Sequence, residues 1–351
     1  MPQGSILGPL LYIIFTNDLP EVVHYHLSTN CTYLISDCRE CGGICCYADD
    51  STFTLSAKNP HQLTVKISDK YERIASYMNS NKLVLNSDKT HLLVMASSKK
   101  HKKHKDFGIF LNTGNEIIEP IASENLLGSV ISNDFTWNKH IRDDAASMIK
   151  KLMVKVNALH VISESASFKT RKSVASSLIL STIMYTIQFY GGCSDYLLSA
   201  LQVVQNRAAR CVTRLPWMTP TFVLLNQCGW LSVRQLGQYH SLVLMFKVRA
   251  DKKPIYIYKR IGDNPSSNTR QETQRTNSRL LKDFRGLKSE TARKTFIPRT
   301  VAQWNGLPSE LRMIDDLPAF KLQLKTWIWR NVPCKEEKYL IFASIVRKAY
   351  A

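Results

Sequence analysis

Residues 47–50 read Tyr-Ala-Asp-Asp, and this short stretch decides more about the fold than any other part of the chain. The carboxylates of Asp49 and Asp50 repel one another unless a cation lies between them, so the pair indicates a divalent metal. Thr52 to Leu55 alternates polar and apolar side chains, which predicts a strand. The pair is therefore predicted at or near a hairpin tip, where both carboxylates can face a hard cation. An ordinary acidic surface turn is the alternative interpretation.

Three further blocks accompany this pair. Residues 2–12 read Pro-Gln-Gly-Ser-Ile-Leu-Gly-Pro-Leu-Leu-Tyr and precede Asn17-Asp18-Leu19-Pro20, residues 86–90 read Asn-Ser-Asp-Lys-Thr, and residues 126–128 read Leu-Leu-Gly. In this order and at these spacings, the blocks resemble the second half of the reverse transcriptase palm of non-LTR (LINE-type) retrotransposons. The resemblance implies an α+β fold, with a partial palm of antiparallel sheet and packed helices, a helical thumb and a helical C-terminal region.

The resemblance also implies functional residues at both ends of the palm block. In that family the Gln-Gly-Ser loop contacts the template and the incoming nucleotide, a role that falls here to Gln3, Gly4 and Ser5. The alternative is a simple helix entry. Leu127 and Gly128 resemble the primer-gripping block, in which a glycine lets the backbone approach the primer strand.

The catalytic centre implied by the resemblance lies between these blocks. Asp49 would be the main metal ligand and Asp50 its companion, with Tyr47 beside the substrate. Lys89 is the candidate for a charge or proton donor near the pyrophosphate leaving group, and a solvated loop lysine is the alternative. The implied activity is RNA-directed DNA synthesis. It would use Mg²⁺ or Mn²⁺ as cofactor, with an RNA template, a DNA primer or RNA–DNA duplex, and dNTPs as partners.

One block of the family pattern has no match in this sequence. Reverse transcriptases hold their metals with carboxylates from two blocks, and the upstream one would precede Gln3; Asp18 is a poor substitute. The sequence therefore predicts a truncated polymerase that is inactive as isolated. A non-enzymatic nucleic-acid-binding remnant of a retroelement is the alternative.

Composition favours a polyanionic partner. The 351 residues carry a formal net charge of +19 and are 44% hydrophobic, as expected for a folded protein. Two basic clusters are candidates for nucleic-acid contact: the loop holding Lys102 and Lys103, and a predicted helix face with Arg207, Arg210 and Arg214. In both clusters a solvated surface is the alternative interpretation.

Nine cysteines, with no signal peptide and no apolar stretch long enough for a membrane span, predict reduced thiols without disulfides and a nuclear or cytoplasmic location. Cys38 and Cys41 have a spacing typical of zinc ligands. Cys45 and Cys46 are instead expected to begin the strand that leads into the acidic hairpin.

The predicted organisation has four segments: 1–138 partial palm, 139–260 helical thumb-like domain, 261–299 basic linker and 300–351 helical C-terminal extension. Apolar spacing predicts helices from Ile67 to Met78, from Ile141 to Leu159 and in two later stretches, 171–189 and 196–215. Residues 83–85 and 92–95 are predicted to be short buried strands.

Overall fold

The computed structural model describes residues 7–24, 43–96, 108–114, 116–261, 279–282, 284 and 286–332. The chain divides into two compact units. The first unit comprises Met1–Asn125 with Ser132–Phe135, and the second comprises Leu126–Ile131 with Thr136–Ala351. The predicted boundary at residue 138 lies close to this division, which runs through one hairpin.

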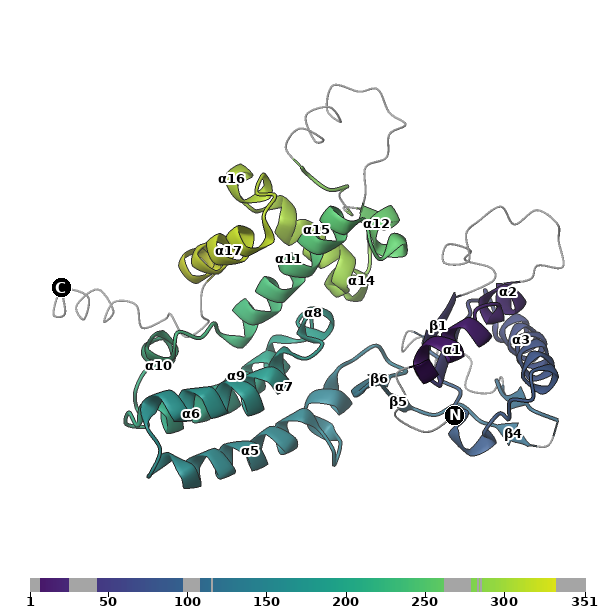
Figure 1. The fold of residues 1–351 in the computed structure, drawn as a ribbon, viewed down its shortest axis with the longest axis horizontal. Helices are drawn as coiled ribbons and strands as arrows, with labels where there is room; N and C mark the ends of the chain where they lie inside the picture. Colours follow the sequence, from purple (N-terminus) through teal and green to yellow (C-terminus); the bar gives the residue numbers. More distant parts are fainter. Residues whose placement is uncertain are drawn as a thin grey trace. The chain divides into compact units, whose positions relative to one another are not determined.

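In its described residues, the first unit holds two short α-helices, several strand pairs and one long helix (Figure 1). In chain order the elements are α1 (Leu7–Phe15), α2 (Leu19–His24), β1 (Gly43–Tyr47), β2 (Asp50–Thr54), α3 (Pro60–Ser80), η1 (Ser87–Lys89), β3 (Leu111–Asn112), β4 (Ile117–Ile118), β5 (Ser123–Leu126) and β6 (Ser129–Ser132). The last hairpin, β5–β6, is the one at which the two units divide.

Helix α3 organises the small core of the first unit. Its start is fixed by Asn59, whose side chain accepts a hydrogen bond of 2.8 Å from the backbone N–H of Gln62, and by a proline in the first turn. Ile74, Tyr77 and Met78 are buried against Leu19. The predicted helix is confirmed, and its inward face buries apolar area that stabilises the unit.

The strands of the described residues form three separate pairs rather than one wide sheet. Pairs β1–β2 and β3–β4 are antiparallel. The prediction of buried strands at 83–85 and 92–95 is wrong. Leu83 and Leu85 do pack on the small core, but Val84 is 94% exposed and no strand pairs with this segment. Leu92 makes only a single bridge, to Pro120. Short runs of apolar residues predicted these strands, and without a neighbouring strand no hydrogen-bonded ladder can form.

The second unit is helical apart from its share of the β5–β6 hairpin, within the residues described. Its elements are η2 (Lys139–Asp143), α5 (Met148–Ser163), α6 (Phe168–Ala175), η3 (Ser176–Leu180), α7 (Ser181–Met184), α8 (Ile187–Tyr190), α9 (Asp195–Thr213), α10 (Thr221–Cys228), α11 (Val233–Asp251), α12 (Ile255–Ile261), α14 (Glu290–Lys294), α15 (Phe296–Asn305), α16 (Ser309–Arg312) and α17 (Leu317–Asn331). The helix predicted at 196–215 is confirmed as α9. The regions predicted as helices at 141–159 and 171–189 are helical but broken, the first at residues 144–147 and the second at Tyr185 and Thr186.

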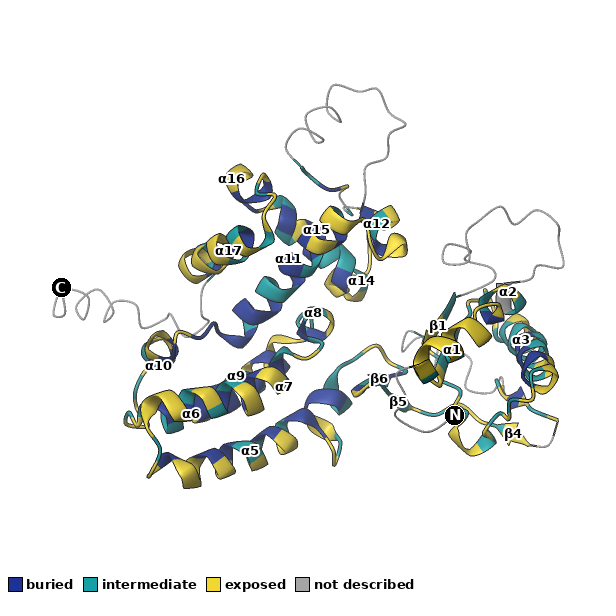
Figure 2. Cartoon of the chain, viewed as in Figure 1, coloured by how far each residue is buried: buried dark blue, intermediate teal, exposed yellow. Residues whose placement is uncertain are grey.

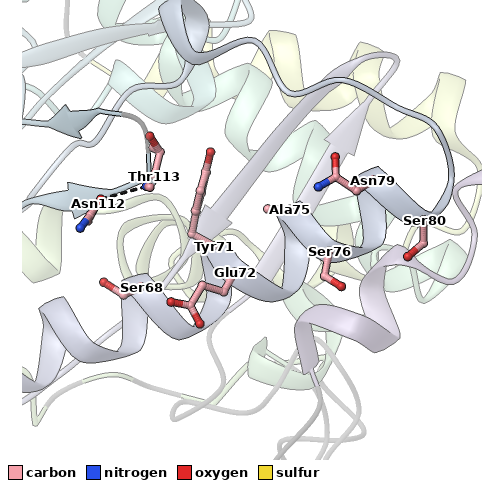
Figure 3. A pocket seen from close by; sticks show the side chains of 10 residues that line it. Ser68, Tyr71, Glu72, Ala75, Ser76, Asn79, Ser80, Asn112 and Thr113 are labelled. Carbon is pink, nitrogen blue, oxygen red and sulfur yellow. Dashed lines mark hydrogen bonds between the residues drawn. The ribbon is translucent and has the colours of Figure 1, made fainter.

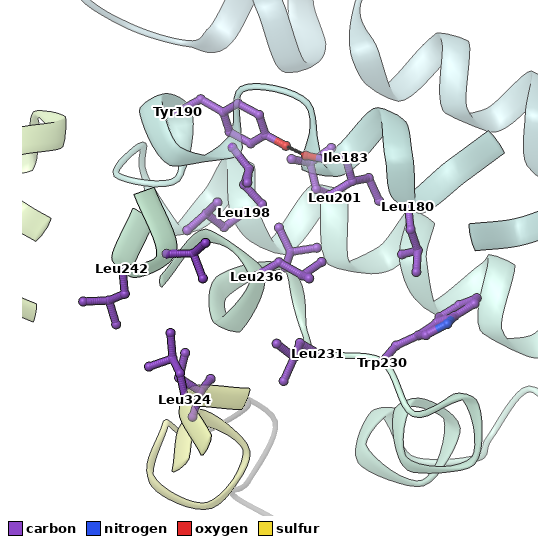
Figure 4. Packing of buried hydrophobic residues seen from close by; sticks show 14 of the residues in the cluster. Leu180, Ile183, Tyr190, Leu198, Leu201, Trp230, Leu231, Leu236, Leu242 and Leu324 are labelled. Atoms are coloured by element: carbon purple, nitrogen blue, oxygen red, sulfur yellow. Dashed lines mark hydrogen bonds between the residues drawn. The ribbon is translucent and has the colours of Figure 1, made fainter. Parts of the chain in front are cut away.

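One hydrophobic core runs through the second unit (Figures 2 and 4). Helix α5 packs along α9, while α11 contacts α8, α9, α15 and α17. Figure 2 shows α11 buried along most of its length, whereas α5 and α6 expose their outer faces. Leu324 of α17 belongs to the same cluster as Leu242 of α11. The described part of the C-terminal region therefore shares its core with the preceding helices α5 to α11.

The segment predicted to be a linker, 261–299, contributes to that core where it is described. Leu281 is buried, and Asn305 holds it with two hydrogen bonds, accepting from its N–H at 2.9 Å and donating to its carbonyl at 3.0 Å. Trp304 is fully buried, and its indole N–H donates to the carbonyl of Arg279. The described residues from 279 onward thus pack with the C-terminal helices, although the composition is basic and poor in apolar residues.

Candidate functional site

The acidic pair lies at the tip of the first hairpin. Strands β1 and β2 pair in a register that ends with Tyr47 opposite Asp50, so Ala48 and Asp49 form a two-residue turn. Ala48 has a φ of +52°, a left-handed conformation that is uncommon for a residue with a side chain. Both carboxylates are exposed, and Tyr47 is 65% exposed. The predicted position at a hairpin tip is what the structure has.

Tyr12 of α1 lies within electrostatic reach of this tip. Burial raises the pKa of the Tyr12 phenol, and the charge of Asp49 and then of Cys46 raises it further. In the sequence, Tyr12 stands only at the end of a motif block, residues 2–12. The signal that could have singled it out is a polar aromatic residue in an otherwise apolar helix, Leu7–Phe15.

Asp18 is bound elsewhere in the first unit. It accepts a hydrogen bond of 2.5 Å from the Tyr77 hydroxyl, and burial, together with this bond, raises the pKa of Tyr77 to about 12. Asp18 therefore secures α3 to the start of α2. This agrees with its assessment as a poor substitute for a metal ligand.

Two carboxylates are the oxygen donors that the hairpin offers to a metal. Carboxylate oxygens are the ligands that Mg²⁺ and Mn²⁺ prefer, so the chemistry of the donor set fits these ions. No group of three or more His, Cys, Asp or Glu side chains with metal-binding geometry exists among the described residues. The hairpin can therefore supply part of a coordination shell, and water or substrate oxygens would have to complete it.

The remaining predicted residues of the first unit are placed as follows. Lys89 is exposed at the end of the short helix η1. Cys45 and Cys46 lie in β1, as predicted, and both are free thiols. Gln3, Gly4, Ser5, Lys102, Lys103 and the zinc candidates Cys38 and Cys41 lie outside the described residues.

The turn at Leu127 and Gly128 is held by the second unit. Both residues have positive φ, +47° and +79°, as the tight turn between β5 and β6 requires. The Tyr185 hydroxyl donates to the Leu127 carbonyl at 2.6 Å, and a Cβ on Gly128 would meet the Tyr185 ring. The turn therefore has a defined partner at a break between α7 and α8.

Two more hydrogen bonds secure the strand that follows this turn. The hydroxyls of Ser129 and Thr186 lie 3.1 Å apart, and the Val130 N–H donates to Nδ1 of His140 at 3.2 Å. His140 is buried, and Trp137 packs against its ring and against the core. Trp137 therefore packs on the core of the second unit.

The three arginines that were predicted to share one helix face make different contacts. Arg210 donates through Nε to the carbonyl of Trp217 at 3.1 Å. Arg214 ends α9 and donates to the carbonyls of Ser163 and Glu164 at the end of α5. Arg207 is exposed, and its guanidinium reaches only the Met153 sulfur. Arg214 therefore also connects the end of α9 to the end of α5.

A polar groove runs beside α3 (Figure 3). It has a volume of about 600 Å³ and is lined by α3 and the turn after β3, with Tyr71, Glu72, Asn79 and Asn112 among its residues. Glu72 is the one charged residue in its lining. A groove without cations does not suit phosphate groups. We assign it no part in the candidate site.

A comparison with known proteins found a family that matches the segment containing the hairpin. Residues 1–118 match the family described as reverse transcriptase (RNA-dependent DNA polymerase). The first third of the chain is therefore similar to reverse transcriptases.

The relatives come from mobile elements. The chain is 23% identical over 219 residues to a probable RNA-directed DNA polymerase from transposon X-element of Drosophila melanogaster, covering 62% of this chain and 22% of that protein. It is 21% identical over 290 residues to the RNA-directed DNA polymerase from mobile element jockey of Drosophila funebris, covering 81% of this chain and 30% of that protein. The chain is thus related to non-LTR retrotransposon polymerases, which confirms the resemblance seen in the sequence.

The chain spans between 22% and 30% of the length of these relatives. No solved structure matches it. Among the described residues, no helix is both long and apolar enough to cross a bilayer.

Proposed function

We propose that this chain carries part of the polymerase site of an RNA-directed DNA polymerase from a retrotransposon. The observation that supports this most directly is the Tyr-Ala-Asp-Asp hairpin, with its exposed carboxylates, inside the segment that matches reverse transcriptases. The substrates would be an RNA template, a DNA primer and dNTPs. Such an enzyme would act in the nucleus or cytoplasm, where its template is found.

In this proposal Asp49 and Asp50 hold a divalent ion, Mg²⁺ or Mn²⁺, through their carboxylate oxygens. When bound, such an ion supplies positive charge that stabilises the phosphate oxygens during nucleotidyl transfer. The hairpin would fix the position of that ion, because Asp49 lies in the two-residue turn and Asp50 is the next residue, at the start of β2. Lys89 is proposed to donate charge or a proton near the pyrophosphate leaving group.

The extent of the activity depends on the number of carboxylates. Two divalent ions about 4 Å apart repel strongly, and fixed acidic side chains must offset that repulsion. Since the described residues offer two carboxylates at the hairpin, we expect the chain to hold one ion weakly. Primer extension by the chain alone is therefore expected to be weak but detectable.

We further propose that the helical unit is thumb-like and contacts the template–primer duplex. Residues 139–261 contain 18 Lys or Arg and 5 Asp or Glu, a net charge of +13. A surplus of this size favours a polyanion and predicts binding that weakens steeply with salt. The turn at Leu127 and Gly128 would then face the primer strand.

A non-enzymatic nucleic-acid binder is the second candidate, and the same charge surplus favours it. Primer extension on a primed RNA template, with Mg²⁺ or Mn²⁺, separates the two. For the polymerase we expect extension that is lost in Asp49→Ala, while duplex binding stays. Asp251→Ala, which removes an exposed carboxylate from the end of α11, is the matched control. Duplex binding without extension in any variant would support the binder.

A further inference from the structure

The turn between α9 and α10 presents two large apolar side chains to solvent. Trp217 is 79% exposed and Met218 is 76% exposed, and Phe222 in the first turn of α10 is 41% exposed. Tryptophan is seldom this exposed in a folded chain, because its large apolar surface favours burial. Tryptophan is enriched at recognition surfaces, because its ring offers a large apolar face and its N–H a hydrogen-bond donor.

The turn that carries Trp217 is held in place from three sides. Pro216 and Pro220 restrict the backbone at its two ends. The N–H of Thr219 donates to the carbonyl of Pro216 at 3.0 Å, which closes the turn. Arg210 donates to the carbonyl of Trp217 itself and ties the turn to the last turns of α9. The indole is therefore presented on a preorganised support, which lowers the entropic cost of binding.

The charges around the turn have one sign. Residues 196–250 contain six Lys or Arg and no Asp or Glu. Arg207, Arg210 and Arg214 form no ion pair in the described part of the chain. Arg214 also lowers the pKa of the buried Arg171, after burial itself. Glu164 approaches Arg214 through its main-chain oxygen.

We propose that Trp217 and Met218 form a stacking platform for an unpaired base of a nucleic-acid strand, with Arg210 beside it and Arg207 about one turn earlier on α9 for the phosphates. Every base has a flat face that can stack on an indole, whatever its identity. Arg210 uses only its Nε in the turn, so its two terminal nitrogens are available to a phosphate oxygen.

A protein partner fits this surface less well. One indole and one methionine cover far less area than a stable protein interface needs, and no acidic side chain is present in the stretch to pair with the rim of such a partner. A single-stranded polyanion requires only stacking and positive charge. The platform rests on the proposed function, because it assigns a single-strand site to the same helical unit that is proposed to bind duplex.

Binding of short oligonucleotides to the full 351-residue chain tests the platform without metal or dNTPs. The probes are a fluorescein-labelled 12-nucleotide oligo(dT) and a blunt 12-base-pair duplex. The variants are Trp217→Ala, Trp217→Phe and, as matched control, Trp329→Ala, which removes the partly exposed indole of α17. Intrinsic tryptophan fluorescence provides a second measurement, since a base stacked on Trp217 quenches its emission.

We expect Trp217→Ala to weaken oligo(dT) binding roughly ten-fold, with Trp217→Phe losing about three-fold because a phenyl ring still stacks. Duplex binding should change by less than about two-fold, and quenching should persist in Trp329→Ala but disappear in Trp217→Ala. Unchanged oligo(dT) affinity and unchanged quenching in Trp217→Ala would overturn the proposal. So would a Trp217→Ala effect confined to self-association in sedimentation. Failure of the polymerase proposal would appear separately, as absent extension in a chain whose oligo(dT) binding still depends on Trp217.

Discussion

The Tyr185 hydroxyl lies 2.6 Å from the main-chain oxygen of Leu127, and this hydrogen bond joins a hairpin turn to a helix break 58 residues later. The tyrosine ring also fills the space beside Gly128, where a Cβ would lie 3.5 Å from the ring. Residues 126–131 therefore belong to the second unit, although the sequence on both sides of them belongs to the first. If the turn contacts the primer, the helical unit holds it in position.

Replacing Tyr185 by Phe tests this relationship. The change removes one hydroxyl and leaves the Leu127 carbonyl to water, so we expect a loss of about 1 kcal/mol in the free energy of unfolding. For a unit of this size, that corresponds to a melting temperature about 2–4 °C lower. Tyr196→Phe is the control, because its exposed ring keeps the cation–π contact with Arg142 without the hydroxyl. Equal melting temperatures of Tyr185→Phe and the parent would show that the hydrogen bond contributes nothing.

Gly192 should tolerate no side chain. Gly192 lies just after α8. A Cβ built on it would collide with the main-chain oxygen of Lys294 and with the guanidinium of Arg299, a residue of α15. Gly192→Ala must move one of these groups, so we expect a loss of about 3 kcal/mol in unfolding free energy, measured by urea denaturation. Gly286→Ala, with no atom within 4 Å of the added Cβ, should change stability little. A Gly192→Ala chain as stable as the Gly286 variant would mean that α14 and α15 do not pack on this turn.

Local pattern was sufficient for some elements of this chain and insufficient for others. The hairpin tip at Asp49 and the helix containing Ile74 follow from neighbouring residues alone, through strand alternation and helical spacing. The buried positions of Leu281 and Trp304 do not, because they depend on contacts with residues more than 20 positions away. A basic segment with few apolar residues can still contribute one leucine that a distant asparagine holds in place.

The candidate site shows the same limit. The motif identified Asp49 and Asp50, but the neighbour that senses Asp49 electrostatically, Tyr12, comes from a helix 37 positions earlier in the sequence. Helical spacing predicted one shared face for the arginines at 207, 210 and 214. Arg207 and Arg210 lie in α9, whereas Arg214 is its C-cap and has a left-handed φ of +58°. Spacing could not reveal that Arg214 donates to carbonyls at the end of α5, because that contact requires the packing of two helices.

Stability should fall in mildly acidic solution because of His140. Burial lowers the pKa of His140, and the positive charge of Lys151 lowers it further. Its Nδ1 accepts a hydrogen bond from Val130, which requires the neutral ring. Since the unfolded chain takes up a proton near the ordinary pKa of about 6.5, it binds more protons than the folded chain below that pH. The contribution of His140 to the free energy of unfolding is therefore fully present above about pH 6.5, and it decreases as the pH falls towards the lowered pKa.

Melting temperatures between pH 7.5 and pH 5 measure this effect. We expect His140→Gln to flatten the pH dependence, with His240 accounting for part of the remainder, because burial and then Lys321 lower the pKa of His240 as well. His160→Gln, at an exposed position of α5, serves as control and should follow the parent curve. A His140→Gln curve parallel to that of the parent would exclude His140 as the source.

Binding of Mn²⁺ at the hairpin should be visible from Tyr12. Because the charge of Asp49 contributes to the raised pKa of Tyr12, after burial, the phenol lies within electrostatic reach of the proposed ion. Paramagnetic Mn²⁺ bound by Asp49 and Asp50 should broaden the NMR signals of the Tyr12 ring, which Tyr12→Phe assigns. With two carboxylate ligands, we expect a dissociation constant on the order of 1 mM. Removal of the metal with EDTA should restore the signals.

Asp49→Asn should abolish the broadening, whereas Asp88→Asn, which neutralises an exposed carboxylate of η1, should keep it. Broadening that persists in Asp49→Asn would place the ion on other ligands and remove the hairpin from the metal site.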